Sequence, residues 1–256
     1  AHVTKQERGA QAVAPPGRSA DHGVIDAVGS QVDQAVSPHL ERAAAADVPV
    51  RRKDFAKHGQ SVKLFPGAAE WFGHINAYAR RQNVNLQHFI ISSGIKEMIE
   101  ATEIGKQFTK VFASSFAYDA NGAAKWPALA INYTTKTQYL FRINKGSLSV
   151  HDHGLINNFV PHEDRPVPFI NMVFIGDGET DIPCMRLVRD QRGHSIAVYQ
   201  PSSSKKKARE EKLITDKRAD FIAPADYRRG GRLDGIVGAI IDKVAANAAV
   251  RAMKRG

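Results

Sequence analysis

The sequence predicts an α/β fold, a Rossmann-like three-layer α/β/α arrangement around a mostly parallel sheet. Short apolar runs, such as "HFIISSG" at 88–94 and "NMVFIGDG" at 171–178, alternate with amphipathic segments of helical length, such as 68–82. Strands that are apolar along their whole length are typical of parallel sheets buried on both faces. Their alternation with helices predicts helical layers on both sides of the sheet.

The expected elements can be placed in chain order from their patterns. Apolar residues at helical spacing predict two short helices between 24 and 47 and a third over 51–62. The "DANG" turn signal predicts a hairpin excursion, and Gly146 is expected to end a helix that starts at Lys136. From residue 63 onward we expect helix 68–82, strand 88–94, helix 95–108, strand 110–119, its hairpin return at 129–135, helix 136–145, loop 147–168, strand 171–178, helix 181–191, strand 194–201, helix 203–218, strand 221–224 and a helix from 231.

Composition limits the classes of protein to which the chain can belong. No run reaches the ~18 apolar residues that a membrane span requires, so no membrane partner is expected. The single Cys184 excludes an internal disulfide framework and favours a reducing, cytoplasmic location. Residues 201–256 hold 14 Lys/Arg and 7 Asp/Glu, which gives +7 of the net charge of +10. No aromatic-rich basic motif accompanies this charge, so nucleic-acid binding is the least favoured interpretation.

Polar groups gather where expected strands end, and ligands of open α/β sheets bind beyond the carboxyl ends of the strands. Asp177 ends the strand in "FIGDGETD", and Asp181 follows four residues later, so one helical turn brings both carboxylates to one side. Two hard oxygen ligands that leave room for water suit Mg²⁺, and the flanking glycines allow close approach of the backbone. The alternative is that Asp181 only caps the following helix.

Two further segments supply groups that suit phosphate. Ser92, Ser93 and Gly94 close an apolar strand just before a helix, where hydroxyls and backbone N–H groups form a cradle for an anion. A plain turn and cap is the alternative for this short motif. Lys136 can neutralise phosphate charge or hold an aspartate–phosphate pair together, and Lys145 is the rival candidate. A solvated surface lysine is the alternative for Lys136.

In this order, the three motifs resemble those of the haloacid dehalogenase (HAD) superfamily, most closely a phosphoserine-phosphatase-like branch of hydrolases. The resemblance runs from "KLFPG" (63–67) to "FIAPADYRRG" (221–230). It implies a small phosphorylated metabolite as substrate and Mg²⁺ as cofactor. Lys136, Asp177 and Asp181 would be the catalytic residues, with both aspartates at the metal. The serine motif at 92–94 and Lys136 would bind the phosphoryl group, and Lys136 would stabilise the phosphoenzyme.

The nucleophile motif of that superfamily, Asp-x-Asp followed by x-Thr or x-Val at the end of the first strand, is absent from the sequence. In the family its first aspartate attacks phosphorus and its second acts as general acid and base. The nearest imitation is "GVIDAVG", where Val28 stands in place of the second acid after Asp26. The following segment resembles the end of the family's helical cap, so the missing motif is expected upstream of residue 1. We therefore expect a disordered segment 1–20, a partial helical cap region 21–62 and a HAD-like core 63–256.

The family's first strand occupies the middle of the sheet, so its loss would leave buried backbone groups unpaired at about 1–3 kcal/mol each. "HGVIDAV" (22–28) is the only segment expected to fill this position. The favoured function is a Mg²⁺-dependent phosphatase (phosphoric monoester hydrolase) scaffold, truncated and inactive as given. The alternative is a non-catalytic regulator that binds phosphate and Mg²⁺. The "HDHG" sequence at 151–154 has no third ligand nearby, which disfavours a metal site there.

Overall fold

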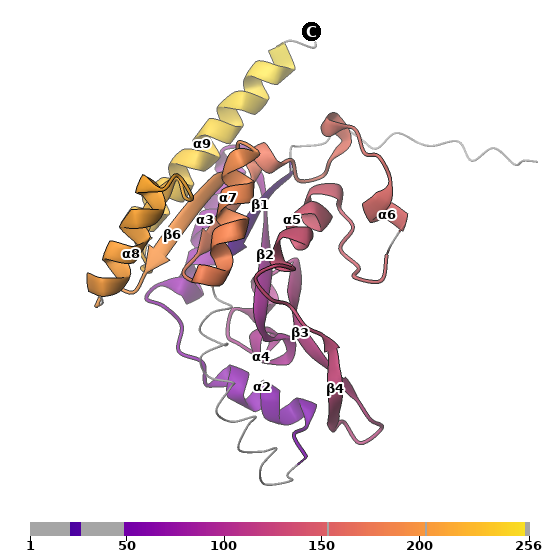
Figure 1. Ribbon diagram of the computed structural model, residues 1–256. Coiled ribbons are helices and arrows are strands. Elements are labelled where there is room, and N and C mark those ends of the chain that lie inside the picture. The colour runs from indigo at the N-terminus through magenta and orange to yellow at the C-terminus, as the bar shows by residue number, and fades with distance from the viewer. Residues whose placement is uncertain (1–20, 27–48, 153, 203, 254–256) are drawn as a thin grey trace, which may run out of the picture.

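The computed structural model describes residues 21–26, 49–152, 154–202 and 204–253, and its strands form a single sheet (Figure 1). The strands are β1 (Asp21–Asp26), β2 (Asn85–Ile95), β3 (Lys110–Tyr118), β4 (Ala124–Leu129), β5 (Val173–Gly176), β6 (His194–Tyr199) and β7 (Phe221–Pro224). Their order is β4-β3-β2-β1-β5-β6-β7, and every neighbouring pair is parallel except β3 and β4. The expected α/β fold with a mostly parallel sheet is confirmed.

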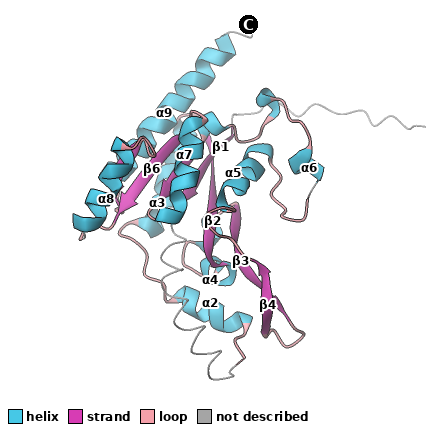
Figure 2. Cartoon of the chain, viewed as in Figure 1, coloured by secondary structure: helices cyan, strands magenta, loops and turns pink. Residues whose placement is uncertain are grey.

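Helices cover both faces of this sheet (Figure 2). They are α2 (Arg52–Gln60), α3 (Ala68–Arg81), α4 (Lys96–Glu100), α5 (Lys136–Lys145), α6 (Gly154–Asn157), α7 (Ile182–Asp190), α8 (Ser204–Thr215) and α9 (Arg232–Met253), with 3-10 turns η1 (Gly105–Gln107), η2 (His162–Asp164), η3 (Phe169–Asn171) and η4 (Glu179–Asp181). Buried side chains of α3 and α9 form one core cluster, and those of α5 and α7 form the other. None of the helices in the described ranges is both long and apolar enough to cross a membrane.

The strand β2 shows why the predicted strands are apolar throughout. Ile90 belongs to the cluster under α3 and α9, whereas its neighbours Phe89 and Ile91 belong to the cluster under α5 and α7. Successive side chains of a strand point to opposite faces, so a strand covered on both faces has no position left for an exposed polar residue.

The central position of the sheet is filled by β1, which lies between β2 and β5. The expectation that the segment 22–28 fills this position is confirmed for residues 22–26, and residues 27 and 28 lie outside the described residues. The helix expected to begin at residue 24 is wrong for residues 24–26, because these continue the strand. The rest of the expected helices between 24 and 47, and most of the expected cap region 21–62, lie outside the described residues. The division into domains stays a prediction, with α2 as its described helical part.

Several expected elements differ in extent from those observed, including the strand expected over 171–178, which is shortened to β5. The helix expected over 95–108 is shortened to α4, followed by the single turn η1. The hairpin after "DANG" is present, but its second strand is β4 rather than residues 129–135. The end of α5 is as expected: Gly146 has φ 73°, a left-handed conformation that favours glycine, and its N–H bonds the last turn.

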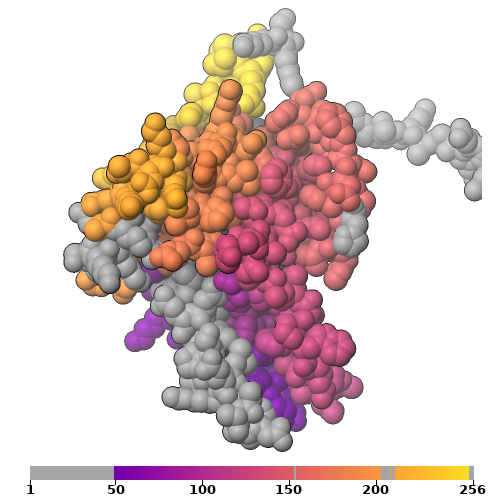
Figure 3. All heavy atoms as spheres, in the orientation of Figure 1, coloured from indigo at the N-terminus to yellow at the C-terminus, as the bar shows by residue number. Residues whose placement is uncertain are grey.

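The segment 147–168, predicted as a loop, contains the short α6 and the turn η2 and packs beside α5, as the red surface in Figure 3 shows. Lys145 fixes it from the end of α5, because its Nζ donates to the carbonyl oxygens of Ile156 (2.7 Å) and Asn158 (2.8 Å). The Lys145 ammonium group thus binds the backbone of this segment.

Candidate functional site

The carboxyl ends of β2, β1 and β5 lie side by side at one edge of the sheet. Asp26, the last residue of β1, is in register with Ile90, two residues before Ser92. On its other side, Ile25 is in register with Phe174, three residues before Asp177. Neighbouring strands are about 5 Å apart, so the backbone of Asp26 lies between the strand that leads to Ser92 and the strand that leads to Asp177.

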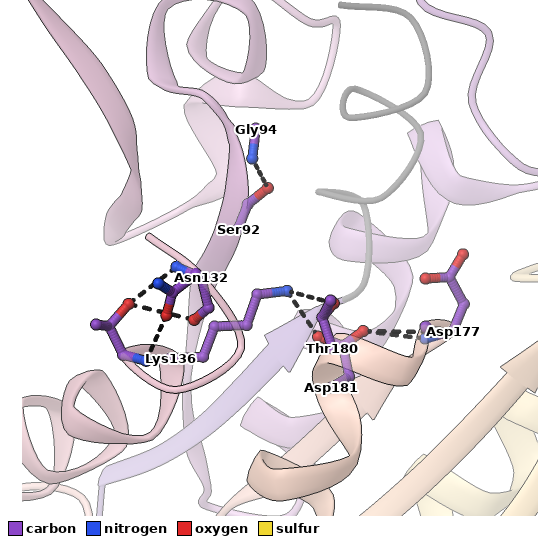
Figure 4. Close-up of polar contacts among 9 residues, drawn as sticks. Ser92, Gly94, Asn132, Lys136, Asp177, Thr180 and Asp181 are labelled. Atoms are coloured by element: carbon purple, nitrogen blue, oxygen red, sulfur yellow. Dashed lines mark hydrogen bonds and ion pairs between the residues drawn. The ribbon is translucent and has the colours of Figure 1, made fainter. Parts of the chain in front are cut away.

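The predicted Lys136 and Asp181 form a buried ion pair at this edge (Figure 4). Lys136 Nζ donates to Asp181 Oδ1 at 2.9 Å and lies 3.3 Å from Thr180 Oγ1. The two charged side chains are only 5% and 8% exposed. The pair joins the start of α5 to the turn η4. The two are close together because α5 packs against α7, the helix that directly follows η4. Of the two candidate lysines, Lys136 reaches the acidic motif.

The second oxygen of Asp181 holds the loop that follows β5. Its Oδ2 accepts the backbone N–H groups of Asp177 at 3.3 Å and Gly178 at 3.4 Å. A Cβ atom at Gly176 would lie 2.7 Å from the Cβ of Asp181, closer than real Cβ atoms approach. Glycine at 176 therefore allows the aspartate to reach the loop backbone.

The serine motif lies on β2, one strand away from this pair. Ser92 is buried, and its Oγ accepts the N–H of Gly94 at 2.9 Å, so that N–H is already used within the motif. The strand β2 continues through Gly94 to Ile95, and its register with β3 shifts between Ser92 and Ile95. Figure 4 shows Ser92 and Gly94 above the Lys136 side chain, which extends past them toward Thr180 and Asp181.

The carboxylates of Asp177 and Asp181 differ in how well they suit Mg²⁺. Asp177 is half-buried at the end of β5, and its carboxylate points away from the Lys136–Asp181 contact (Figure 4). A carboxylate at a strand end is a ligand that Mg²⁺ accepts, so Asp177 fits. Both carboxylate oxygens of Asp181 already accept hydrogen bonds from the protein. Asp181 therefore fits better as a residue that would contact Mg²⁺ through a water molecule or hold the backbone near it than as a direct ligand. Across the described ranges, no three His, Cys, Asp or Glu residues gather as a metal site.

The sequence reasoning missed one contributor to this geometry. Thr180 lies within the acidic motif and contacts Lys136 Nζ, although nothing in its spacing distinguished it from an exposed turn residue. Cys184 lies beside the pair in the first turn of α7. Burial, and then the charge of Asp181, raise the pKa of its thiol to about 12. The "HDHG" segment has another role, since Asp152 Oδ1 accepts the N–H of Leu155 at the start of α6.

Comparisons with known proteins give a distant relative and fold-level likenesses. No protein-family model matches the chain. A curated "Uncharacterized protein" of Borreliella burgdorferi is 27% identical over 195 residues, covering 68% of this chain. The chain spans 65% of the length of that relative.

Among solved structures, a HAD family hydrolase from Salmonella enterica serovar Typhi aligns with 86% of the chain and 71% of its own length, at 14% identity and TM-score 0.45. A probable phosphoserine phosphatase from Vibrio cholerae aligns with 90% of the chain and 69% of its own length, at 14% identity and TM-score 0.48. Likenesses with such low identities and TM-scores do not assign a function.

Proposed function

We propose that the chain is a HAD-like phosphoric monoester hydrolase scaffold that binds Mg²⁺ and the phosphoryl group of a small phosphorylated metabolite. The observation that supports this most is the buried contact between Lys136 and Asp181, residues 45 positions apart in sequence. The sequence predicts the lysine and the acidic segment as two motifs of one phosphate site. A buried ion pair is a costly arrangement in a protein that needs only stability, which favours a functional role.

Each residue has a defined part in this proposal. Asp177 would ligate Mg²⁺, which when bound would neutralise negative charge on the phosphoryl oxygens. An ammonium group has three N–H donors, and Lys136 directs two of them to Asp181 and Thr180. The third can donate to a phosphoryl oxygen. Ser92 would bind another phosphoryl oxygen from the neighbouring strand β2.

The chain lacks the complete nucleophile motif that a phosphatase of this kind needs. The backbone of Asp26 ends the central strand β1, where a nucleophile in this superfamily is expected. Val28 cannot act as general acid and base, a role that contributes about 10²–10⁴-fold to rate. We therefore propose that the 256-residue chain binds phosphate but hydrolyses esters close to the uncatalysed rate.

The proposal is tested by calorimetry and by hydrolysis of p-nitrophenyl phosphate. We expect inorganic phosphate to bind only when Mg²⁺ is present, and binding to be lost on Asp177→Asn. Val28→Asp should raise hydrolysis by about a hundredfold or more, and adding Asp26→Asn should remove the gain. Absence of phosphate binding in the presence of Mg²⁺ would reject the phosphate site. Hydrolysis by the unchanged chain that Asp177→Asn abolishes would reject the claim of low turnover.

A non-catalytic regulator that senses phosphate is the second candidate, because it needs the same phosphate-binding residues without a nucleophile. It predicts Mg²⁺-dependent phosphate binding in the unchanged chain and in Val28→Asp, with no hydrolysis by either. The response of hydrolysis to Val28→Asp therefore separates the two functions.

A further inference from the structure

The position of Lys136 is set by a hydrogen-bonded turn that precedes its helix. The main-chain carbonyl oxygen of Asn132 accepts the N–H groups of Thr135 at 3.1 Å and of Lys136 at 3.0 Å. The Thr135 N–H also donates to the side-chain oxygen Oδ1 of Asn132, at 3.1 Å. By its hydrogen bonds, the helix therefore starts one turn before the first residue of α5.

Asn132 has the bonding pattern of a helix N-cap. Its Oδ1 accepts the backbone N–H groups of Thr134 at 3.0 Å and Thr135 at 3.1 Å, and the Thr134 hydroxyl at 2.6 Å. In return, the N–H of Asn132 donates to Thr135 Oγ1 at 2.9 Å. This reciprocal exchange between the cap residue and the residue three positions later is a capping box. The side chains thereby pair the backbone N–H groups of Asn132 and Thr134 at the start of the first turn.

The cap is anchored to the sheet on its other side. The N–H of Ile131 donates to Ser114 Oγ of β3 at 3.0 Å, and the Ile131 side chain is buried in the core. The turn is thus fixed to β3 before Asn132 and to α5 after it. Figure 4 shows Asn132 and its partners at the base of the Lys136 side chain, which leads to Thr180 and Asp181.

We propose that Asn132 is a positioning residue for the phosphate site, acting through the Lys136 backbone to hold the Lys136 ammonium against Asp181. A cation in the first turn faces the positive end of the helix dipole. Lys136 is held there with only 4% of its surface exposed, so its side chain has little freedom to recover if the turn shifts. Since Asp181 also binds the backbone of the Asp177 loop, a shift at Asn132 reaches that loop. The expected effect on phosphate binding rests on the proposed function, whereas the expected effect on the position of Lys136 does not.

The test compares four forms of the full chain. Asn132→Ala removes the cap, whereas Asn132→Asp keeps a capping oxygen of similar preference. Asp54→Ala is the matched control, because Asp54 Oδ2 accepts the Arg51 N–H at 2.9 Å and so caps α2 instead. We measure the affinity for inorganic phosphate with Mg²⁺, the thermal midpoint, and the NMR signals of the Gly178 amide and the Lys136 ammonium.

Loss of a residue that orients a binding group costs about ten- to a hundredfold in affinity. We expect that loss in Asn132→Ala, recovery in Asn132→Asp, and unchanged affinity in Asp54→Ala despite a similar fall in midpoint. The Gly178 and Lys136 signals should shift in Asn132→Ala alone. Equal affinity in Asn132→Ala and the unchanged chain, or an equal loss in Asp54→Ala, would overturn the inference. If the unchanged chain binds no phosphate, the proposed function fails, and the two NMR signals still decide whether Asn132 positions Lys136.

Discussion

Lys136 Nζ lies 2.9 Å from Asp181 Oδ1, and the two side chains are almost completely buried. The contact connects two separate segments of the chain. Lys136 is held by the turn before α5, and Asp181 is held by the backbone after β5. Removing a charge from water is costly unless its partner and hydrogen bonds compensate for it. The pair is therefore both a structural contact and the centre of the candidate site.

Breaking this pair on one side should destabilise the fold more than removing it entirely. Lys136→Met or Asp181→Asn leaves an uncompensated buried charge, and we expect each to lower the free energy of unfolding by about 3–5 kcal/mol. The double variant should recover part of that loss, which urea unfolding in a double-mutant cycle measures. Additive losses in the double variant would show that the two charges do not interact in solution.

Gly176 should tolerate no side chain, because Asp181 and Met185 occupy the space beside it. A Cβ at this position would lie 2.6 Å from Met185 Cε and 2.7 Å from the Cβ of Asp181. We expect Gly176→Ala to cost about 1–3 kcal/mol in unfolding free energy and to weaken phosphate binding.

The control is Gly73, an exposed position inside α3 where a Cβ would meet nothing within 4 Å. Gly73→Ala should stabilise the helix by about 0.5–1 kcal/mol. Equal stability of the Gly176→Ala variant and the unchanged chain would mean that the Asp181 side chain can lie elsewhere.

Most of the fold follows from local patterns of the sequence. The apolar runs became strands, and Gly146 ended α5, because burial on both faces and a left-handed backbone leave clear residue preferences. The edge strand β4 was misplaced because it lacks such a pattern: Trp126 is 67% exposed there. The central position of β1 was predicted from the family resemblance rather than from propensities, whereas the full order of strands comes from the structure.

The candidate site was predictable in its residues but less so in its contacts. Spacing suggested that Asp177 and Asp181 present two carboxylates together, whereas Asp181 pairs with Lys136 and with the loop backbone. That choice depends on the packing of α5 against α7, which no local pattern encodes. The cap at Asn132 did leave a local signal, because an Asn followed three residues later by Thr can form a reciprocal cap.

Cys184 should be inert in the folded protein despite its place next to the site. Burial and the charge of Asp181 raise the pKa of the thiol from 9.0 to about 12. The thiolate is the reactive form, so its population falls roughly a thousandfold. We expect iodoacetamide to label the unfolded chain at the rate of a free thiol and the folded chain far more slowly, as followed by mass spectrometry. Equally fast labelling of both states would mean that α7 opens readily.

His88 should make the protein sensitive to mild acid, because its ring is buried between α3 and the sheet. Its Nε2 lies 2.8 Å from Asn76 Oδ1, and the ring packs edge-on against Phe72 and Trp71. Burial lowers its pKa from 6.5 to about 4. Since the unfolded chain binds the proton more tightly, this stability is fully present above the unfolded pKa of 6.5 and is lost as the pH falls toward the folded value of about 4.

Between pH values of about 7.5 and about 5, we expect the unfolding free energy to fall by about 2 kcal/mol through this residue. His88→Gln keeps a neutral polar group near Asn76 but cannot titrate, so that part of the pH dependence should disappear. Urea unfolding of both forms at the two pH values gives the difference directly, and the other histidines cancel because they are common to both. Parallel pH dependences in the two forms would mean that the His88 ring reaches water in the folded state.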